Sequence, residues 1–310
     1  MGSNARDAKF PLGSLYTAAL MYYEEDATQA DIARRLGTSR ATVSRLLSEA
    51  RRVGIVNIEV RPPAEADEGL ASALAERLGL RGAYVGPVAP DALVGATLGP
   101  AVSAAVKDAG LEAGDVLLTS SGRAVWSAAK HLPPLPGVLV TPTVGGQNEA
   151  APWYQTNEIT RVVAEKIGGH PVFLHAPAVP GPDLYDRLLD DDSIRGVLDM
   201  WDTARCALLG VGAPPAARES LPGFVDRTGA WTEQAVGDIC ARFYGQDGQP
   251  VDFPGSDRLI ATDLDQLRRV PVTIAIAAGA EKTPSIRAGA RAGWFNTLVT
   301  DTATAHALLE

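Results

Sequence analysis

The sequence has little cysteine and no long apolar run, and each shortage excludes a class of protein. Among its 310 residues are two cysteines, Cys206 and Cys240, both inside apolar segments. Two such cysteines make no disulfide framework, so we expect reduced thiols in a cytoplasmic protein. No run of about 18 apolar residues is present and the first ten residues have no apolar core, so neither a membrane span nor a secretory signal is expected.

Histidine is also scarce, and the common cofactor motifs are missing. The four histidines have no metal-ligand spacing; they are His131, His170, His175 and His306. No segment matches a Walker motif or GxGxxG, which argues against a nucleotide or dinucleotide pocket. The sequence therefore predicts neither a metal site nor a cofactor.

Positive charge is in deficit overall but concentrated near the N-terminus. The formal net charge is −9, from 28 basic and 37 acidic residues. Residues 1–62 hold nine basic and seven acidic residues, a local +2, and the other 19 basic and 30 acidic residues give −11. Six of those nine basic residues fall between Arg34 and Arg52. A local basic face on an acidic protein is typical of a DNA module joined to a domain that avoids DNA.

The spacing of four residues near the N-terminus predicts a helix-turn-helix. Ala33 lets two helices cross closely, Gly37 permits the sharp turn, and Val43 with Leu46 locks the second helix onto the first. The preceding segment 15–25 has apolar residues at helical spacing and is expected to be the supporting helix. Such a unit reads duplex DNA.

The outward face of the second helix carries the side chains that a recognition helix needs. Arginine can bond guanine bidentately, serine and threonine can bond bases or phosphates, and a helix N-terminus favours phosphate. The predicted DNA-binding residues are Thr28, Gln29, Ser39, Arg40, Thr42, Ser44 and Arg45. An ordinary amphipathic hairpin with solvated arginines would explain neither the full spacing nor the basic clustering.

A domain boundary is expected near residue 62. After Gly54, the alternating segment 55–60 predicts a short strand and hence a winged helix-turn-helix. The proline-rich, acidic stretch that follows reads as a linker. We therefore predict a DNA-binding domain over residues 1–62 and a second domain over 63–310.

Short β-rich runs alternate with apolar helices beyond that boundary. Strands are expected at 83–88, 115–119, 137–141, 171–174, 206–211, 258–262, 272–277 and 297–299, and helices at 70–78, 91–109, 123–131, 157–167, 282–292 and 302–309. Continuous apolar strands separated by helices predict an α/β fold whose largely parallel sheet is covered on both faces.

Three loops after predicted strands are rich in glycine or hydroxyl groups: 119–123, 144–148 and 210–213. Ligands of open parallel sheets bind at such loops, where small residues, hydroxyls and helix N-termini suit phosphate and Arg123 adds positive charge. A phosphorylated small molecule fits, but each loop alone is explained equally well by a tight turn. Lys282 either reaches into the same cleft or is a surface cation.

Several longer segments resemble the SorC family of bacterial transcriptional regulators. Beside the helix-turn-helix they are VTPTVGGQN, GGHPVFLHAPA, VGDICARFYGQDG and the stretch 270–309, which contains Glu281-Lys282 and NTLVTD. The resemblance covers nearly the full length. It implies a Rossmann-like α/β effector domain similar to ribose-phosphate isomerase and glucosamine-phosphate deaminase, which binds a sugar or sugar phosphate in a homo-oligomer, a dimer or usually a tetramer.

The family's sugar and phosphate contacts can be carried over position by position. They fall on Ser120, Ser121, Gly122, Arg123, Gly145, Gly146, Gln147, Asp238 and Lys282. The first loop usually reads GWG followed by Thr in this family, and SSGR here points to a different effector. In the deoxyribonucleoside type a lysine before the paired glycines can form a Schiff base. Val144 stands at that place, so no covalent effector is expected.

The two-part layout predicts a DNA-binding regulator of a carbohydrate-metabolism operon, controlled by a sugar or sugar phosphate. Its expected partners are double-stranded operator DNA, the effector and further copies of the chain, with no membrane. One alternative is a sugar-phosphate isomerase or deaminase with an added helical module, in which Asp238 or Glu281 is the base. No paired acid and base emerges, so no catalytic residue is assigned. Another alternative is a sugar-binding domain whose helical module contacts only proteins.

Overall fold

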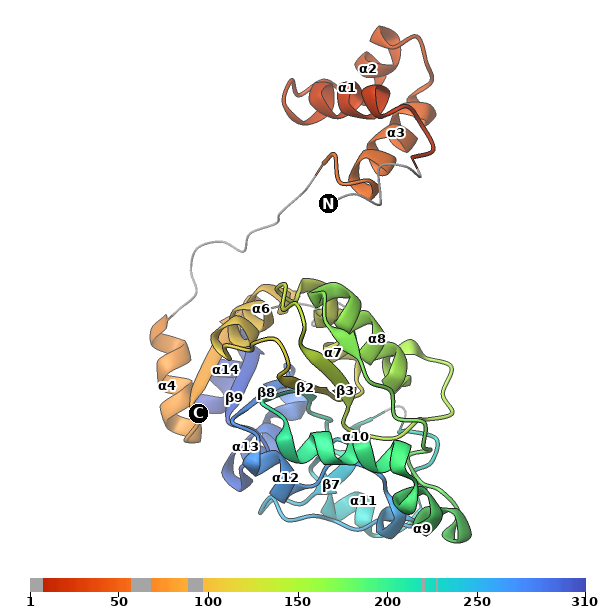
Figure 1. Ribbon diagram of the computed structural model, residues 1–310. Coiled ribbons are helices and arrows are strands. Elements are labelled where there is room, and N and C mark those ends of the chain that lie inside the picture. Colours follow the sequence, from red (N-terminus) through yellow and green to blue (C-terminus); the bar gives the residue numbers. More distant parts are fainter. Residues whose placement is uncertain (1–7, 57–67, 89–96, 219–220, 227) are drawn as a thin grey trace. The chain divides into compact units, whose positions relative to one another are not determined.

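The chain divides into two compact units in the computed structural model (Figure 1), Met1–Arg61 and Pro62–Glu310. The structure describes residues 8–56, 68–88, 97–218, 221–226 and 228–310. The expected boundary near residue 62 and residues 57–60 of the expected wing strand lie outside these ranges. Each unit is considered by itself below.

The described part of the N-terminal unit consists of three helices around one small core. They are α1 (Leu12–Tyr23), α2 (Gln29–Arg35) and α3 (Arg40–Arg52). Each helix contributes a fully buried aliphatic side chain, Leu15, Ile32 and Val43 respectively. On each helix the apolar residues are spaced so that their side chains share one face. This arrangement confirms the helix-turn-helix and its supporting helix.

Side-chain caps start α2 and α3. The hydroxyl of Thr28 accepts a hydrogen bond from the backbone N–H of Asp31 at 3.2 Å, and the hydroxyl of Ser39 accepts one from Thr42 at 3.1 Å. Gly37, between the two helices, has φ +61°, a left-handed conformation that costs glycine little. The turn that separates the two helices therefore follows from local sequence.

A seven-stranded parallel sheet forms the centre of the larger unit, with strand order β1-β9-β8-β5-β2-β3-β4. The strands are β1 (Gly82–Gly86), β2 (Val116–Thr119), β3 (Leu139–Pro142), β4 (His170–Pro171), β5 (Cys206–Gly210), β8 (Val272–Ile276) and β9 (Thr297–Asp301). The predicted parallel α/β fold is confirmed.

Helices cover both faces of this sheet (Figure 1). One face carries α4 (Glu68–Leu78), α10 (Asp192–Thr203), α12 (Leu264–Arg269), α13 (Thr283–Ala292) and α14 (Thr302–Leu309), with α9 (Pro182–Asp190) packed beside α10. The other face carries α6 (Gly99–Asp108), α7 (Arg123–Ala128) and α8 (Thr156–Ile167). Successive strand residues alternate between the two cores, as Leu117 and Leu118 do.

A small antiparallel hairpin, β6 (Gly237–Ile239) and β7 (Arg242–Tyr244), forms a separate sheet that the sequence did not predict. Its turn residues Cys240 and Ala241 have φ of +54° and +61°. Such turns usually carry asparagine or glycine, so the sequence holds no turn signal there. Phe243 packs with Trp231, from the short helix α11 (Trp231–Gln234), in a third apolar cluster under the hairpin.

Two strand predictions need correction. The expected strand 258–262 is wrong: a turn of 3-10 helix, Ser256–Arg258, is followed by chain with only one isolated bridge, from Ala261 to Val144. The stretch reads like a strand because Leu259, Ile260 and Ala261 are apolar and buried, but it is not paired with any described strand of the central sheet. The expected strand 171–174 shrinks to β4. Residues 91–96 of the expected helix 91–109 lie outside the described ranges.

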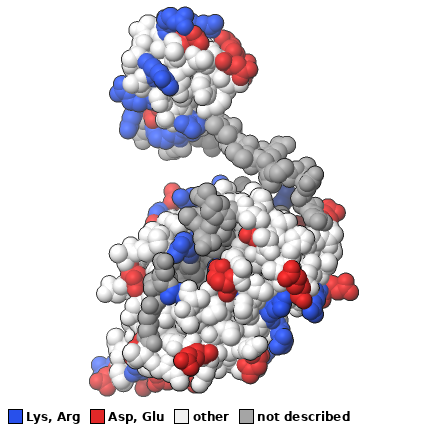
Figure 2. Space-filling model, turned by 180° about the vertical axis from the view of Figure 1, so that it is seen from behind, with Lys and Arg blue, Asp and Glu red and all other residues white. Residues whose placement is uncertain are grey.

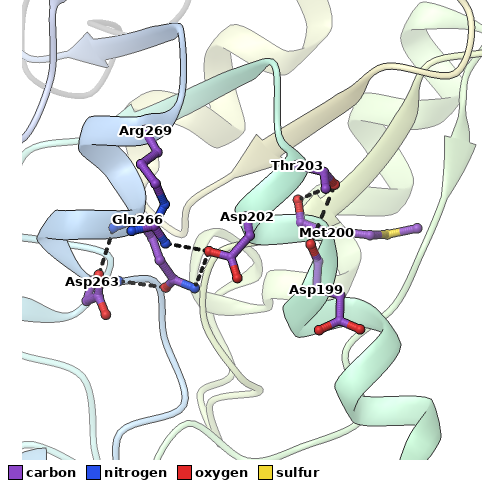
Figure 3. A network of polar contacts seen from close by, with 7 residues as sticks. All are labelled: Asp199, Met200, Asp202, Thr203, Asp263, Gln266 and Arg269. Carbon is purple, nitrogen blue, oxygen red and sulfur yellow. Dashed lines mark hydrogen bonds and ion pairs between the residues drawn. The ribbon is translucent and has the colours of Figure 1, made fainter.

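A polar network joins helices α10 and α12 (Figure 3). The Oδ1 atom of Asp202 accepts hydrogen bonds from Gln266 Nε2 at 3.3 Å and from Arg269 Nη2 at 2.6 Å. Gln266 and Asp263 also form a reciprocal capping box at the start of α12. The network fixes α12 against α10 and so holds the segment that leads into α12.

The strand order creates one switch point. From β2 the chain advances outward to β3 and β4, and it then returns to place β5 on the other side of β2. The loops that follow β2 and β5 therefore lead to opposite faces of the sheet. Ligands of open α/β sheets bind in the crevice at such a point.

Candidate DNA interface and effector site

The starts of α2 and α3 meet at an open surface depression. Thr28 and Gln29 line it from the start of α2, Arg40 lines it from the start of α3, and Tyr22 and Tyr23 border it from α1. Three of the predicted DNA-binding residues, Thr28, Gln29 and Arg40, thus share one surface, although Arg40 is at least 11 positions from the other two in the sequence. Asp26 also lines the depression, so binding of a phosphate group there depends on Arg40 and the helix N-termini.

The predicted residues of α3 differ in how free their side chains are. Ser39, Arg40, Ser44 and Arg45 are exposed, whereas Thr42 is half-buried. The hydroxyls of Ser39 and Thr42 lie 2.9 Å apart at the helix start, so these two side chains help to cap α3. Arg40, Ser44 and Arg45 are the better candidates for contacts with bases or phosphates.

Acidic neighbours neutralise only some of the arginines in this unit. The pairs are Arg34–Asp31, Arg35–Glu25 and Arg52–Glu49. Within the described part of the chain, Arg40 and Arg45 form no ion pair. Most of the visible basic side chains of this unit lie over its top and left side in Figure 2. The unpaired charges can therefore serve DNA phosphates.

Glu49 has a structural part in the same unit. Its buried carboxylate accepts hydrogen bonds from the Arg52 guanidinium at 2.7 Å and from the backbone N–H of Lys9 at 2.8 Å. These hydrogen bonds, that of Arg52 first, lower the pKa of Glu49 to about 2. The carboxylate thus ties the chain before α1 to the end of α3.

In the larger unit, the predicted effector residues follow neighbouring strands. The loops after β3, β2, β5 and β8 leave four adjacent strands at the same edge of the sheet. The β6–β7 hairpin is joined to the β5 loop, because the N–H of Gly212 donates to the carbonyl of Asp238 at 2.9 Å. The structure therefore brings the predicted effector-binding residues to one edge.

The Ser120 hydroxyl links the loop after β2 to the end of β5 across the switch point. This buried hydroxyl accepts a hydrogen bond from the N–H of Gly210 at 2.8 Å and donates to the carbonyl of Ser121 at 3.0 Å. Gly122 has φ +133°, and its N–H donates to the carbonyl of Trp153 at 2.8 Å. The loop conformation thus depends on a hydroxyl and a glycine at fixed positions.

Arg123, the first residue of α7, lies against an aromatic ring. Its guanidinium carbon is 5.5 Å from the centroid of the Trp153 ring, which is the range of a cation–π contact. The side chain is nevertheless exposed. A ligand anion at the start of α7 could therefore still reach Arg123.

Close packing requires the first of the paired glycines after β3. A Cβ atom on Gly145 would lie 2.7 Å from the backbone of Pro177. The N–H groups of Gly145 and Gly146 donate to the carbonyls of Ile260 and Ala176 at 2.9 and 2.7 Å. These donors are thus used within the fold, and a ligand contact at this loop depends on Gln147.

Gln147 is buried beside the loop after β2. Its Nε2 donates to the Ser121 hydroxyl at 3.3 Å. Among the described residues its Oε1 atom has no hydrogen-bond partner. A buried acceptor without a partner is costly, and a ligand hydroxyl could satisfy it.

Asp238 is held by Arg218, which the sequence analysis did not select. Arg218 Nη1 lies 2.5 Å from Asp238 Oδ1, and both side chains are less than one-fifth exposed. Burial opposes the charge of Arg218, but Asp238 and the hydroxyl of Tyr154 raise its pKa above the usual value. Arg218 comes shortly after the loop that follows β5, and this position in the sequence was the signal that could have marked it as a site residue.

Tyr154 and Trp153 were missed as well. Both belong to one turn of 3-10 helix, Pro152–Tyr154, between the β3 loop and α8. Trp153 contacts Arg123, and Tyr154 interacts with Arg218. The turn thus contacts two arginines, Arg123 after β2 and Arg218 after β5.

Lys282 ends a turn of 3-10 helix after β8 and is half-buried. The next helix, α13, contacts the strand of Asp238: the Ser285 hydroxyl donates to the carbonyl of Val236, the residue before β6, at 2.5 Å. Lys282 therefore belongs to the same edge of the sheet as the other predicted effector-binding residues.

Other chemistry has little support in the described ranges. No group of three or more His, Cys, Asp or Glu residues there could hold a metal ion. No helix described is long and apolar enough to cross a membrane. Burial raises the pKa of Cys206 to about 12 and that of Cys240 to about 11, so both thiols stay protonated at neutral pH.

Comparison with protein families gives two matches. Residues 63–310 match the family described as "Putative sugar-binding domain". Residues 20–53 match the family described as sigma-70, region 4. The first match covers the larger unit, and the second covers the helix-turn-helix.

Named relatives are similar over nearly the whole chain. The sorbitol operon regulator of Klebsiella pneumoniae is 31% identical over 304 residues, which are 94% of this chain and 96% of that protein. The deoxyribonucleoside regulator of Bacillus subtilis (strain 168) is 32% identical over 304 residues, again 94% and 96%. The crystal structure of full-length SorC from Klebsiella pneumoniae has a TM-score of 0.75 at 29% identity, covering 97% of this chain and all of that one. The enzyme alternative receives no support from these regulators.

Proposed function

The chain belongs to the SorC family of transcriptional regulators, and we propose that a sugar or sugar phosphate controls its binding to the operator of a carbohydrate-metabolism operon. The N-terminal unit reads operator DNA, and the larger unit binds the effector. The chain acts in the cytoplasm as a homo-oligomer, and no catalytic step is assigned to it. The names of its regulator relatives, one for sorbitol and one for deoxyribonucleosides, support a carbohydrate effector.

One observation carries the effector site. Loops from four adjacent strands bring Ser121, Arg123, Gln147, Asp238 and Lys282 to the edge of the sheet that contains the switch point. Hydroxyl, amide and carboxylate groups suit sugar hydroxyls, and the arginine and lysine suit a phosphate or another anionic group. The mixture of both chemistries favours a polyol with an anionic end.

The loop after β2 distinguishes this effector site. The Ser120 hydroxyl and the Gly122 N–H already make hydrogen bonds within the fold, to the N–H of Gly210 and the carbonyl of Trp153 respectively. Effector selectivity then depends on the side chains that project from the frame, namely Ser121, Arg123 and Gln147. The SSGR sequence therefore selects an effector other than those of relatives with the usual loop.

Control of DNA binding requires the effector to distinguish between two oligomer arrangements. A ligand shifts an equilibrium only by its difference in affinity for the two states. Because recognition helices must match half-sites about one helical turn apart, a change of subunit arrangement alters operator affinity. This coupling is reciprocal, so operator DNA changes effector affinity by the same factor.

A gel-shift assay tests the proposal. The full chain is mixed at low salt with DNA from upstream of its own gene, with and without a panel of sugars and sugar phosphates. We expect a retarded band whose intensity changes with at least one ligand. No retarded band under any condition would contradict the DNA-binding function. A band that no ligand alters, when a thermal-shift screen of the same panel shows binding, would contradict effector control.

A further inference from the structure

Helix α1 carries a second apolar surface in addition to the one it buries. Leu15, Ala18 and Ala19 face the core of the N-terminal unit. Leu12 and Tyr16 are 44% and 58% exposed, and Tyr23, seven residues beyond Tyr16, is 38% exposed. Among the described residues, four of the six exposed large hydrophobic side chains lie on this helix; they are Leu12, Tyr16, Tyr22 and Tyr23.

Four of its side chains form one continuous ridge. Leu12, Tyr16, Leu20 and Tyr23 recur at i, i+4, i+8 and i+11, the spacing of a single stripe along an α-helix. Leu20 is half-buried, so the ridge runs along the border of the buried face. Below, these four residues are called the α1 ridge. Such a stripe suits another apolar helix.

The ridge also lacks charge. The sequence of α1, LGSLYTAALMYY, contains no Lys, Arg, Asp or Glu. A surface without positive charge gains little from DNA phosphates, unlike the arginine-bearing face of α3. Across a two-fold axis the same patch meets itself, so any net charge on it would repel its copy. An uncharged apolar stripe avoids that repulsion.

We propose that the α1 ridge is the contact surface between the N-terminal units of two copies of this chain. The contact fixes the separation of the two recognition helices while leaving the outward face of each α3 free for DNA. It rests on the proposed function, in which the chain is an oligomeric regulator. Tyr23, at the end of the ridge, also lines the depression beside Arg40, so the contact ends where the candidate DNA surface begins. The partner is a second copy of the chain.

The area of the ridge supports a conditional contact. On the scale of roughly 150–250 Å² for a whole aromatic side chain, the exposed parts of the ridge offer roughly 300 Å² per copy. Stable interfaces bury about 1,200–2,000 Å² in total, so two ridges alone would associate weakly. Tethering in an oligomer raises the effective concentration to the millimolar range, where a weak contact can close.

Cysteine cross-linking of the full chain tests the contact. Cys206 and Cys240 are buried, so a single introduced thiol is the accessible one. Tyr16→Cys and Leu12→Cys place it on the ridge, and Ser14→Cys places it on another side of the same helix, also exposed. With a short bismaleimide, we expect both ridge variants to form dimers about tenfold faster than the control, because the tether keeps the ridges together.

A charge variant gives an independent readout. Tyr16→Asp would bring two carboxylates together across the contact, so we expect about tenfold weaker operator binding, since like charges at an interface are costly. The thermal transitions and the oligomeric state set by the larger unit should stay unchanged. Ser14→Asp is the matched control for added charge.

The outcomes separate this inference from the proposed function. If the wild-type chain is oligomeric and retards operator DNA, but the ridge variants cross-link no faster than Ser14→Cys, the ridge contact is wrong and the regulator stands. Equal losses of operator binding in Tyr16→Asp and Ser14→Asp would also overturn the ridge contact. If the wild-type chain neither oligomerises nor retards DNA, the proposed function itself fails.

Discussion

The two units of the chain solve opposite problems with different means. The N-terminal unit keeps most of its candidate DNA-binding side chains exposed on two helices and has a single small core. The larger unit buries much of its candidate site, and its sheet separates two extensive cores. Small domains bury a smaller share of their surface and are marginally stable. A small loss of stability can therefore disturb the candidate DNA surface, whereas the packing of the whole larger unit stabilises the candidate effector site.

A second difference concerns backbone donors. In α3 the arginines that could meet DNA project from a regular helix into solvent. In the candidate effector site the N–H groups of Gly145, Gly146 and Gly210 all make hydrogen bonds within the fold. Substitutions of these arginines should therefore change DNA binding alone, whereas substitutions in the loops of the larger unit can change both effector binding and the stability of that unit.

The largest expected effect comes from the core of the small unit. Leu46→Ala removes a side chain that is 5% exposed, which typically costs about 2–5 kcal/mol. That cost approaches the whole stability of a unit of this size, roughly 0.05–0.15 kcal/mol per residue. We expect operator binding to be lost while the calorimetric transition of the larger unit stays in place. Ser48→Ala on the same helix is the control, and an equal shift of both transitions would contradict independent units.

The next effect comes from the buried ion pair of the larger unit. Asp238→Ala leaves the Arg218 guanidinium without its carboxylate, and both side chains are less than one-fifth exposed. Breaking such a pair costs about 2–3 kcal/mol, below the fully buried value because some solvent remains. Calorimetry should show a lower transition for the larger unit and an unchanged one for the N-terminal unit. The double variant Asp238→Ala with Arg218→Met should recover stability; no recovery would mean that the pair is not the cause.

A smaller effect is expected at the DNA surface. Arg45→Ala should weaken operator binding by about 1–3 kcal/mol if the guanidinium contacts a base, and effector affinity should stay unchanged. Arg34→Ala is the matched control, because Arg34 is exposed and already paired with Asp31. Fluorescence anisotropy at one fixed salt concentration measures both. Equal losses for the two variants would indicate a general charge effect.

The smallest expected effect is an acid dependence of the N-terminal unit. The pKa of Glu49 is lowered to about 2 from an ordinary 4.5 by hydrogen bonds from Arg52 and Lys9. A lowered folded pKa contributes stability that is present above pH 4.5 and lost as the pH falls toward 2. Circular dichroism should show the Tm of this unit falling through that window. Glu49→Gln should flatten the slope, and an unchanged slope would assign the acid sensitivity to other groups.

Local patterns made the N-terminal unit predictable. The caps Thr28 and Ser39, the turn at Gly37 and the apolar spacing of α3 lie within a few residues of one another. The grouping of the loops after β2, β3 and β5 was predictable because parallel strands put their carboxyl ends at one edge. These features depend on sequence neighbours or on a general rule of topology.

Long-range packing decided the rest. Arg218 and Asp238 are 20 residues apart and meet only through the β5 loop and the β6–β7 hairpin. That hairpin has no turn signal, since Cys240 and Ala241 occupy its left-handed positions. Residues 259–261 are buried and hydrogen-bonded to the loops at Gly145 and Ala178. Their apolar run is typical of a strand, although they pair with no described strand of the central sheet. Each error arises where tertiary contacts override a local pattern.

The central claim is that an effector bound to the larger unit controls DNA binding by the N-terminal unit. The most direct measurement is the Kd of the full chain for labelled upstream DNA, by anisotropy, with and without each sugar or sugar phosphate that raises the Tm of the larger unit. We expect at least one such ligand to change the Kd about tenfold, within the usual range of allosteric coupling. A Kd that stays the same with every ligand shown to bind would contradict the account.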